Sequence, residues 1–484
     1  MARHPNDSRG RGRKLPAPWI LAAAVLAFCS LCACARTARD AQGAPDVAAA
    51  MDAYLTAAHK LQWFSGNVFV ARGGRVILNK GYGLADYELG VPFTPRTKFR
   101  LGSVTKQFTA MAVLQLEEKG LLKVADTVRS VFPDYPEGDR ITIHHLLTHT
   151  AGIPNFTSFP DYPKAMLFPT SVQEAVDRFK NRPLDFPPGE KFRYSNSGYV
   201  LLGAIIEKVS GETYEAFLRE NIFRPLGMED SGYDHREDIL KDRASGYEFV
   251  KDQKVNASYV DMSVPYAAGA LYSTVLDLYK WDRALYTDKL VPQAALTRMF
   301  TPFDPHAGPA PATGMSKETY AYGWVVKSSA GHKEISHGGG VNGFATHIAR
   351  FPDDDACVIV LNNFLTAHIQ RVSDSLAALL FGQAVEMPED RKPVKLPAAV
   401  LDSYPGRYQV EGEPMVFTVV RDGDNLLLQA PGQPELVLRP RSEAAFFSRR
   451  ANMDVIFEKD ASGRVSHFVL VRGILKTKAV RVEE

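Results

Sequence analysis

The sequence predicts a mixed α/β (α+β) protein in which helices pack on one sheet, followed by a small all-β domain. Strand-like runs occur near residue 70 and again between residues 320 and 362, and mostly helical patterns lie between them. Strands at both ends of a helical middle indicate one sheet that is built from the two termini of a domain. After a polar stretch that contains prolines, short β-rich runs continue to the C-terminus.

The N-terminal residues predict export. The chain has 484 residues, 45% of them hydrophobic and 23% charged, which is ordinary globular composition and more than one domain usually needs. Four arginines and a lysine precede an apolar run over residues 19–35. A basic segment, a short apolar run and small residues are typical of an export signal, and the run is shorter than the roughly 20 residues of a membrane span. We therefore expect residues 1–35 to be a signal and the protein to be periplasmic or secreted.

The end of this signal leaves two alternatives open. Leu31-Cys32-Ala33-Cys34 is similar to a lipoprotein cleavage box, whereas Ala33-Cys34-Ala35 fits ordinary cleavage. A lipid on Cys34 would tether the protein to a membrane.

Without the first 35 residues the formal charge changes from +2 to −2, so no nucleic-acid partner is expected. Cys357 is then the remaining cysteine, which excludes an intrachain disulfide and a cysteine-based metal site.

The first part of the domain alternates helix and strand signals. The run DVAAAMDAYLTAAHKL is a short helical pattern, and NVFVARGGRVILNKGYG predicts a β-hairpin that turns at Gly73-Gly74. From Ser103 apolar residues recur at nearly helical spacing until Gly120. We expect a substantially buried helix there, with Ser103 at its N-terminal end.

The later elements follow from the same rules. Residues 120–300 are mostly helical patterns, and Thr274 with Asp277 fits a capping box in which Asp replaces Glu. Four strand signals and one helix signal follow: YAYGWVVKS, HKEISHGG, FATHIARF, ACVIVLNN and VSDSLAALLFG. Asp353-Asp354-Asp355 is interpreted as a hairpin turn and not as a calcium loop. The predicted domains are an export signal at 1–35, a first domain at 45–383, a linker at 384–397 and a barrel or sandwich at 398–484.

Ser103 and Lys106 form a Ser-x-x-Lys pair that could begin acyl transfer. Side chains three residues apart on a helix are neighbours, and a poorly solvated lysine has a lowered pKa, so it can take the proton of a serine. The alternative is that Ser103 merely caps the helix and that Lys106 is exposed.

Two further motifs lie later in the chain. Tyr194-Ser195-Asn196 leads into an apolar helix, and a tyrosine beside a lysine can transfer protons if the positive charge of that lysine lowers its pKa of about 10. Alternatively, this segment is only a helix-entry loop. His337-Gly338-Gly339-Gly340 lies on a strand signal where a backbone N–H could bind a developing oxyanion, although such a run is more often a turn. It lacks the Lys-Ser/Thr of a phosphate loop.

The three motifs together resemble the penicillin-recognising serine hydrolases. Ser103-Val-Thr-Lys106, Tyr194-Ser-Asn196 and His337-Gly-Gly339 have the order and spacing of that superfamily, and the chain is similar to its class C β-lactamase, D-alanyl-D-alanine peptidase and esterase branch. The resemblance spans residues 50–383 and implies an antiparallel sheet flanked by helices, with a helical subdomain. The segment from LDSYPGRYQV is similar to lipocalin-like β-domains, which implies a barrel.

The resemblance also implies a role for each motif residue. Ser103 is acylated, Lys106 and Tyr194 share proton transfer, and Asn196 orients the substrate amide or Lys106. His337 and Gly339 contact the substrate, and the backbone N–H groups of Ser103 and Gly340 form the oxyanion hole. True class C β-lactamases have Lys-Thr-Gly at the third motif. With His337, a weaker and pH-dependent partner for a substrate carboxylate, efficient β-lactam hydrolysis is less expected.

The predicted function is therefore a serine hydrolase that needs no metal or organic cofactor and acts on esters, amides or D-amino-acid peptides. A β-lactamase proper or a D-alanyl-D-alanine carboxypeptidase is one alternative, and a cell-wall-binding or sensor protein without turnover is another. His145 and His149 have a zinc-like spacing, but the general-base Glu is missing and a packed helix is favoured. Residues 156–168 are either a wall of the substrate cleft or a packed loop. The oligomeric state stays open.

Overall fold

The fold described here is that of a computed structural model covering residues 47–482 except 304–318, 367, 414, 432–434, 452 and 473–474. It begins with a helix over residues 47–60, as the sequence predicted. The expected export signal at 1–35 and the lipid on Cys34 fall outside the described residues and stay predictions. Among the described helices, none combines the length and the apolar character that a membrane crossing requires.

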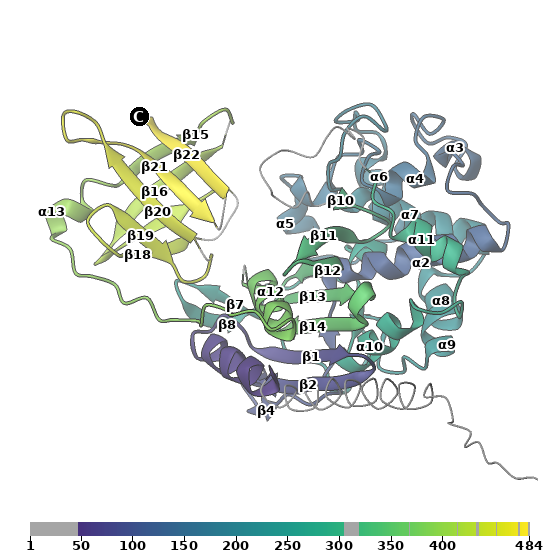
Figure 1. The fold of residues 1–484 in the computed structure, drawn as a ribbon. Coiled ribbons are helices and arrows are strands. Elements are labelled where there is room, and N and C mark those ends of the chain that lie inside the picture. The colour runs from purple at the N-terminus through teal and green to yellow at the C-terminus, as the bar shows by residue number, and fades with distance from the viewer. Residues whose placement is uncertain are drawn as a thin grey trace, which may run out of the picture. The chain divides into compact units, whose positions relative to one another are not determined.

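A seven-stranded antiparallel sheet forms the centre of the first domain (Figure 1). The hairpin of the N-terminal strands turns at Gly73 and Gly74, both with positive φ, as predicted. It pairs with the last strand of the sheet, which confirms that the two ends of the domain build one sheet. In spatial order the strands are β10 (Thr319–Tyr320), β11 (Val325–Ser329), β12 (His332–Val341), β13 (Phe344–Phe351), β14 (Ala356–Asn362), β1 (Gly66–Arg72) and β2 (Arg75–Tyr82).

Helices cover both faces of this sheet. On β13, His347 accepts or donates a 2.8 Å hydrogen bond with Ser373 of α12 (Ile369–Leu380). Arg350, three residues further along the same strand, donates to Asp282 of α10 (Val275–Ala284) at 3.0 Å. Because successive side chains of a strand point to opposite faces, α12 and α10 lie on opposite sides of the sheet. Figure 1 shows α12 in front of the strands.

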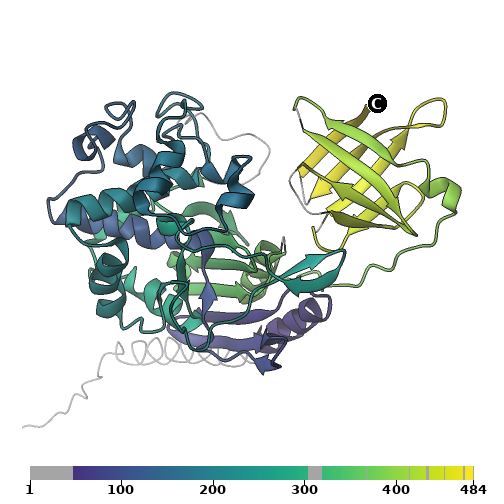
Figure 2. The ribbon, with the colours of Figure 1, turned by 180° about the vertical axis from the view of Figure 1, so that it is seen from behind.

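The helical region between the N-terminal hairpin and β10 is visible in both ribbon views (Figures 1 and 2). Its core is α2, of which every residue but the last two is buried, packed against α7. The helices and helical turns are η1 (Gly102–Val104), α2 (Thr105–Glu118), α3 (Val128–Val131), α4 (Ile143–Leu147), η2 (Phe156–Ser158), α5 (Tyr162–Ala165), α6 (Val172–Lys180), α7 (Asn196–Ser210), α8 (Tyr214–Leu218), η3 (Arg219–Phe223), α9 (Arg224–Leu226), η4 (Tyr266–Ala268) and α11 (Gln293–Met299), with η5 (Pro352–Asp354) between β13 and β14.

The region also contains short strands that the sequence did not predict. They are two to four residues long, too short for alternation of polar and apolar residues to be recognised. The strands pair as β3 (Leu84–Asp86) with β4 (Val91–Pro92), β9 (Leu271–Ser273) with both β5 (Phe99–Arg100) and β6 (Gly232–Tyr233), and β7 (Tyr247–Val250) with β8 (Gln253–Asn256).

The capping box predicted at α10 is only half formed. Thr274 accepts from the backbone N–H of Asp277 at 3.1 Å, but the Asp277 carboxylate accepts from the backbone of Asp230 and from Ser231 instead of returning to the cap. An aspartate is one methylene shorter than the glutamate of the usual box, and here it finds partners in another segment.

The C-terminal domain is a closed eight-stranded antiparallel barrel, as the lipocalin-like resemblance implied. A short helix, α13 (Ala398–Leu401), precedes it. Aromatic side chains such as Tyr404, Tyr408, Phe457 and Phe468 form its buried core. The strands are β15 (Gly406–Val410), β16 (Val416–Asp422), β17 (Asn425–Gln429), β18 (Leu436–Pro440), β19 (Ala445–Ser448), β20 (Met453–Lys459), β21 (Val465–Arg472) and β22 (Leu475–Val482).

Candidate active site

Ser103 lies in the sharp entry from β5 into α2, and it does not cap the helix. No side chain makes a capping hydrogen bond at the start of η1 or α2. The Ser103 hydroxyl oxygen instead lies 3.0 Å from Lys106 Nζ. Gly102 precedes it with a φ of +54°, a left-handed conformation that glycine adopts without strain. This geometry therefore does not support the alternative that Ser103 is only a helix cap.

The same glycine lets two backbones approach each other. A Cβ atom on Gly102 would lie 2.7 Å from the backbone nitrogen of Gly340, and one on Gly339 would lie 1.9 Å from the carbonyl oxygen of Leu101. The pairing between β11 and β12 stops at Ser336, so the segment from His337 onward presents its edge to η1. The backbones that hold Ser103 and Gly340 are thus in direct contact, as an oxyanion hole made from both would require.

Lys106 is completely buried one helical turn after Ser103. Its amine lies 3.0 Å from the Ser103 hydroxyl, 2.9 Å from Asn196 Oδ1 and 2.8 Å from the carbonyl oxygen of Ala268. These three partners are all uncharged. Burial without a countercharge lowers the pKa of Lys106 well below its usual value. The amine is therefore poised to be neutral and to accept a proton.

Tyr194 lies just before α7, with its ring centroid 4.9 Å from Lys106 Nζ. Burial raises the pKa of Tyr194, and a hydrogen bond with Ser103 offsets part of this rise. The sequence argument required a positive Lys106 to lower this pKa. Burial lowers the pKa of Lys106 and so disfavours that positive charge, and the raised pKa of Tyr194 keeps its phenol protonated and able to donate a proton.

Asn196 begins α7 and orients Lys106. Its Oδ1 accepts from Lys106, and its Nδ2 donates to Thr157 Oγ1 at 3.3 Å. Asn155 fixes the arrangement, because its Oδ1 accepts from the Asn196 backbone at 3.0 Å and its Nδ2 donates to Thr157 at 2.8 Å. Thr157 belongs to the segment 156–168 that the sequence placed either at the substrate cleft or in a packed loop. Asn155 carried no signal of its own, and the contact brings both residues to the site.

His337 departs most from its expected role. Its Nδ1 donates to the carbonyl oxygen of Gly338 at 2.5 Å, and its Nε2 accepts from the Tyr320 hydroxyl at 2.9 Å. Burial, with Lys106 nearby, lowers the pKa of His337 to about 3. The ring is neutral and both nitrogens are occupied, so it does not offer the charged, pH-dependent partner for a substrate carboxylate that the sequence predicted. The centroid of its ring lies 6.3 Å from that of the Tyr194 ring.

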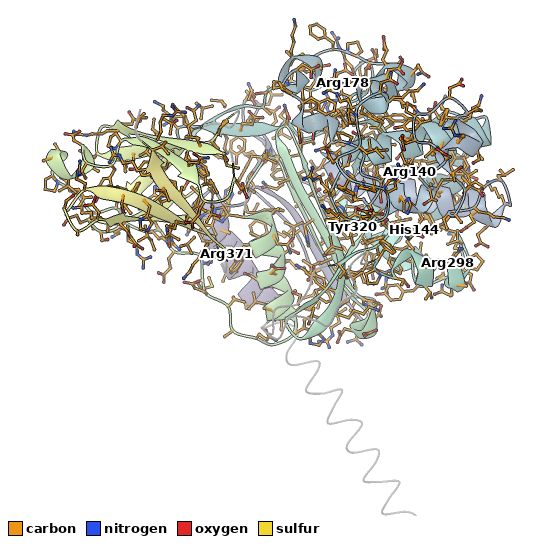
Figure 3. All side chains as sticks on the ribbon, turned by 90° about the horizontal axis from the view of Figure 1, so that it is seen from above. Arg140, His144, Arg178, Arg298, Tyr320 and Arg371 are labelled. Carbon is orange, nitrogen blue, oxygen red and sulfur yellow. The ribbon has the colours of Figure 1, made fainter. Side chains whose placement is uncertain are left out.

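Tyr320 reaches the site from β10. The sequence predicted one strand over residues 320–328, but the structure divides this segment into β10 and β11, which pair with each other. Figure 3 labels the Tyr320 side chain at the junction of the sheet and the helical region. It is buried, and its ring lies 5.8 Å from that of Phe192 and 4.6 Å from that of His149. No sequence signal linked Tyr320 with His337, because only the β-sheet brings them together.

Both histidines of the zinc-like pair have partners within the protein. His145 accepts from the backbone of Thr142 and closes a capping box at α4, and the structure brings together no group of metal-ligating side chains in its described part. His149 packs against Tyr194 instead, with ring centroids 4.2 Å apart.

Comparison with known proteins agrees with this geometry. A family model described as Beta-lactamase matches residues 47–386. The chain belongs to the β-lactamase family. Penicillin-binding protein 4* of Bacillus subtilis is 31% identical to it over 444 residues, covering 87% of this chain and 95% of that protein. As a member of this family, the chain is a serine hydrolase of the β-lactamase and penicillin-binding-protein type.

Solved structures of this family share the fold. The octameric penicillin-binding protein homologue from Pyrococcus abyssi is 28% identical, with a TM-score of 0.63, and covers 89% of this chain and 99% of its own. The D-amino acid amidase from Ochrobactrum anthropi SV3 is 25% identical, with a TM-score of 0.61, and covers 70% of this chain and 99% of its own.

Replacing Gly102 with alanine should separate Ser103 from Gly340. The added Cβ collides with the Gly340 backbone, and misplacing one oxyanion donor costs ~10²–10³ in rate. Gly120→Ala is the matched control, because Gly120 also has a positive φ of +70° but nothing lies within 4 Å of its Cβ position. Both variants strain the backbone, but only Gly102→Ala should lose fluorophosphonate labelling. Equal labelling rates in the two variants would contradict the proposed contact.

The pH profile of kcat/KM should show the ionisation of Lys106 at a lowered pKa. Acylation needs the unprotonated amine, so activity should rise with pH through one ionisation that lies below the usual lysine pKa. The raised pKa of Tyr194 predicts no alkaline fall below about pH 10. His337, with a pKa of about 3, should add no step between pH 5 and 8. A second ionisation near pH 6.5 that disappears in His337→Gln would refute its neutral state.

Proposed function

We propose that the protein hydrolyses esters or amides that carry no carboxylate beside the scissile bond, through an acyl-enzyme on Ser103. The observation that carries this proposal is the buried Lys106 amine with its three uncharged partners. A neutral amine has two N–H groups and one lone pair, and these match two acceptors, Asn196 Oδ1 and the Ala268 carbonyl, and one hydroxyl, that of Ser103. The lone pair then faces the hydroxyl that has to be activated.

The proposed reaction follows from these positions. The Ser103 oxygen attacks the substrate carbonyl while its proton moves to Lys106, and the backbone N–H groups of Ser103 and Gly340 stabilise the oxyanion. Tyr194 gives its phenolic proton to the leaving group and recovers one from Lys106. Water then attacks the acyl-enzyme, with the same groups running the proton transfers in the reverse order.

The neutral third motif supports a substrate without a carboxylate beside the scissile bond. Penicillins and D-alanyl peptides carry such a carboxylate, and here both ring nitrogens of His337 are bound within the protein. We therefore rank esters and simple amides above β-lactams. The resemblance to a D-amino acid amidase supports amides of D-amino acids as a second substrate class.

A binding or sensor protein without turnover is the competing proposal. The arrangement of the base, the phenol and the Gly102–Gly340 contact supports catalysis over it, because a pure binding site does not need a proton acceptor beside the serine.

Covalent labelling tests the proposal. Incubation with a fluorophosphonate should add one adduct to the wild type, detected by intact mass, and none to Ser103→Ala. Turnover should fall by ~10⁶ in that variant, as it does when a comparable serine is removed. Labelling that persists in Ser103→Ala would overturn the assignment of the nucleophile.

A substrate panel tests the specificity in the same preparation. We expect p-nitrophenyl esters and amino-acid amides to be hydrolysed faster than nitrocefin or D-alanyl-D-alanine peptides. A nitrocefin rate equal to the ester rate would overturn the argument from His337. Labelling of Ser103 without turnover of any substrate would favour the sensor.

A further inference from the structure

We propose that His149 is the positioning residue of Tyr194, and that it holds this phenol where it can deliver a proton to the leaving group. The inference rests on the proposed function, since it assigns a partner to one of its proton-transfer groups. His149 is the second histidine of the zinc-like pair, and the catalytic scheme above does not use it.

His149 accepts two hydrogen bonds, from the residues on either side of Tyr194. The backbone N–H of Ser195 donates to His149 Nδ1 at 3.2 Å, and the backbone N–H of Arg193 donates to the His149 carbonyl oxygen at 3.0 Å. One residue therefore fixes the chain immediately before and immediately after Tyr194. The His149 ring also packs on the Tyr194 ring, at 4.2 Å and an angle of 41°.

The first of these bonds sets the proton on the histidine. Nδ1 can accept from Ser195 only when it carries no hydrogen, so the neutral ring carries its hydrogen on Nε2. Burial and the neighbouring Lys106 and His337 lower the pKa of His149 well below its usual value, in agreement with a neutral ring. The two hydrogen bonds that His149 accepts and its ring contact with Tyr194, together called the clamp, therefore stay the same over the pH range in which the enzyme would work.

Two features of His149 are energetically unfavourable in the folded protein. Its backbone has a φ of +58°, in the left-handed region that non-glycine residues rarely adopt. Its Nε2 is buried and has no hydrogen-bond partner, while its ring faces those of Tyr199 and Tyr320 at centroid distances of 5.1 Å and 4.6 Å. Strained backbone and unsatisfied buried groups gather at functional sites, where the surroundings hold them.

Substitutions at 149 can separate the parts of this clamp. Asparagine tolerates a positive φ, and its Oδ1 takes the position of Nδ1, so His149→Asn keeps the acceptor and loses the ring. Phenylalanine keeps a ring and leaves the Ser195 N–H buried without an acceptor. We expect His149→Phe to lower kcat at least ~10-fold with little change in KM, because positioning acts on the transition state. His149→Asn should recover most of this loss.

The leaving group provides a readout that a purely structural role would not change. A p-nitrophenolate departs without a proton, whereas an alkyl alcohol or an amine needs one. His149→Phe should therefore slow the hydrolysis of alkyl esters and amides at least ~10-fold more than that of p-nitrophenyl esters. Melting temperatures of the variants show whether a uniform loss comes from unfolding.

A double-mutant cycle with Tyr194→Phe decides the proposal. If His149 acts through Tyr194, adding His149→Phe to Tyr194→Phe should cost little more than Tyr194→Phe alone. Additive losses, or equal losses on both kinds of leaving group, would overturn the role of His149 while leaving Ser103 labelling intact. If the wild type shows no labelling that depends on Ser103, the proposed function fails and this inference fails with it.

Discussion

The reaction that we propose for this protein depends on one buried amine. Lys106 lies in α2, and ten of the twelve residues that follow it in that helix are buried. A charged ammonium in such a place would need a countercharge, and its three partners are instead a hydroxyl, an amide and a peptide carbonyl. Desolvation therefore favours the neutral base. The packing of α2 against α7 and η4 supplies the dry surroundings as well as two of the three partners.

The second constraint is the close approach of two chain segments that are distant in sequence. Ser103 and Gly340 come together only because Gly102 and Gly339 have no side chains. These glycines act in different ways. Gly102 also needs its left-handed conformation, whereas Gly339 simply leaves space for the carbonyl oxygen of Leu101. Both effects are local to the backbone, and both bring together the two backbone N–H groups that form the oxyanion hole in the proposed reaction.

Sequence patterns predicted the parts of the structure that local rules determine. The hairpin at Gly73-Gly74, the buried helix after Ser103 and the barrel all followed from periodicity, turn residues or motif resemblance. The pair of Ser103 and Lys106 was also predicted, because residues three apart on a helix are neighbours. The state of His337 could not be predicted in the same way. It depends on the burial of its ring and on Tyr320, which another strand delivers.

Three basic side chains, Lys106, His149 and His337, lie close together at this site. Burial lowers the pKa of each of them. Burial is the main cause that lowers the pKa values of His149 and His337, and a positive charge on Lys106 would lower both further. A proton taken from Ser103 therefore enters a place where desolvation disfavours positive charge. It has a strong tendency to leave again. In the proposed reaction Tyr194 is the neutral phenol beside Lys106 that can pass it on, so the absence of a countercharge serves proton release as much as proton uptake.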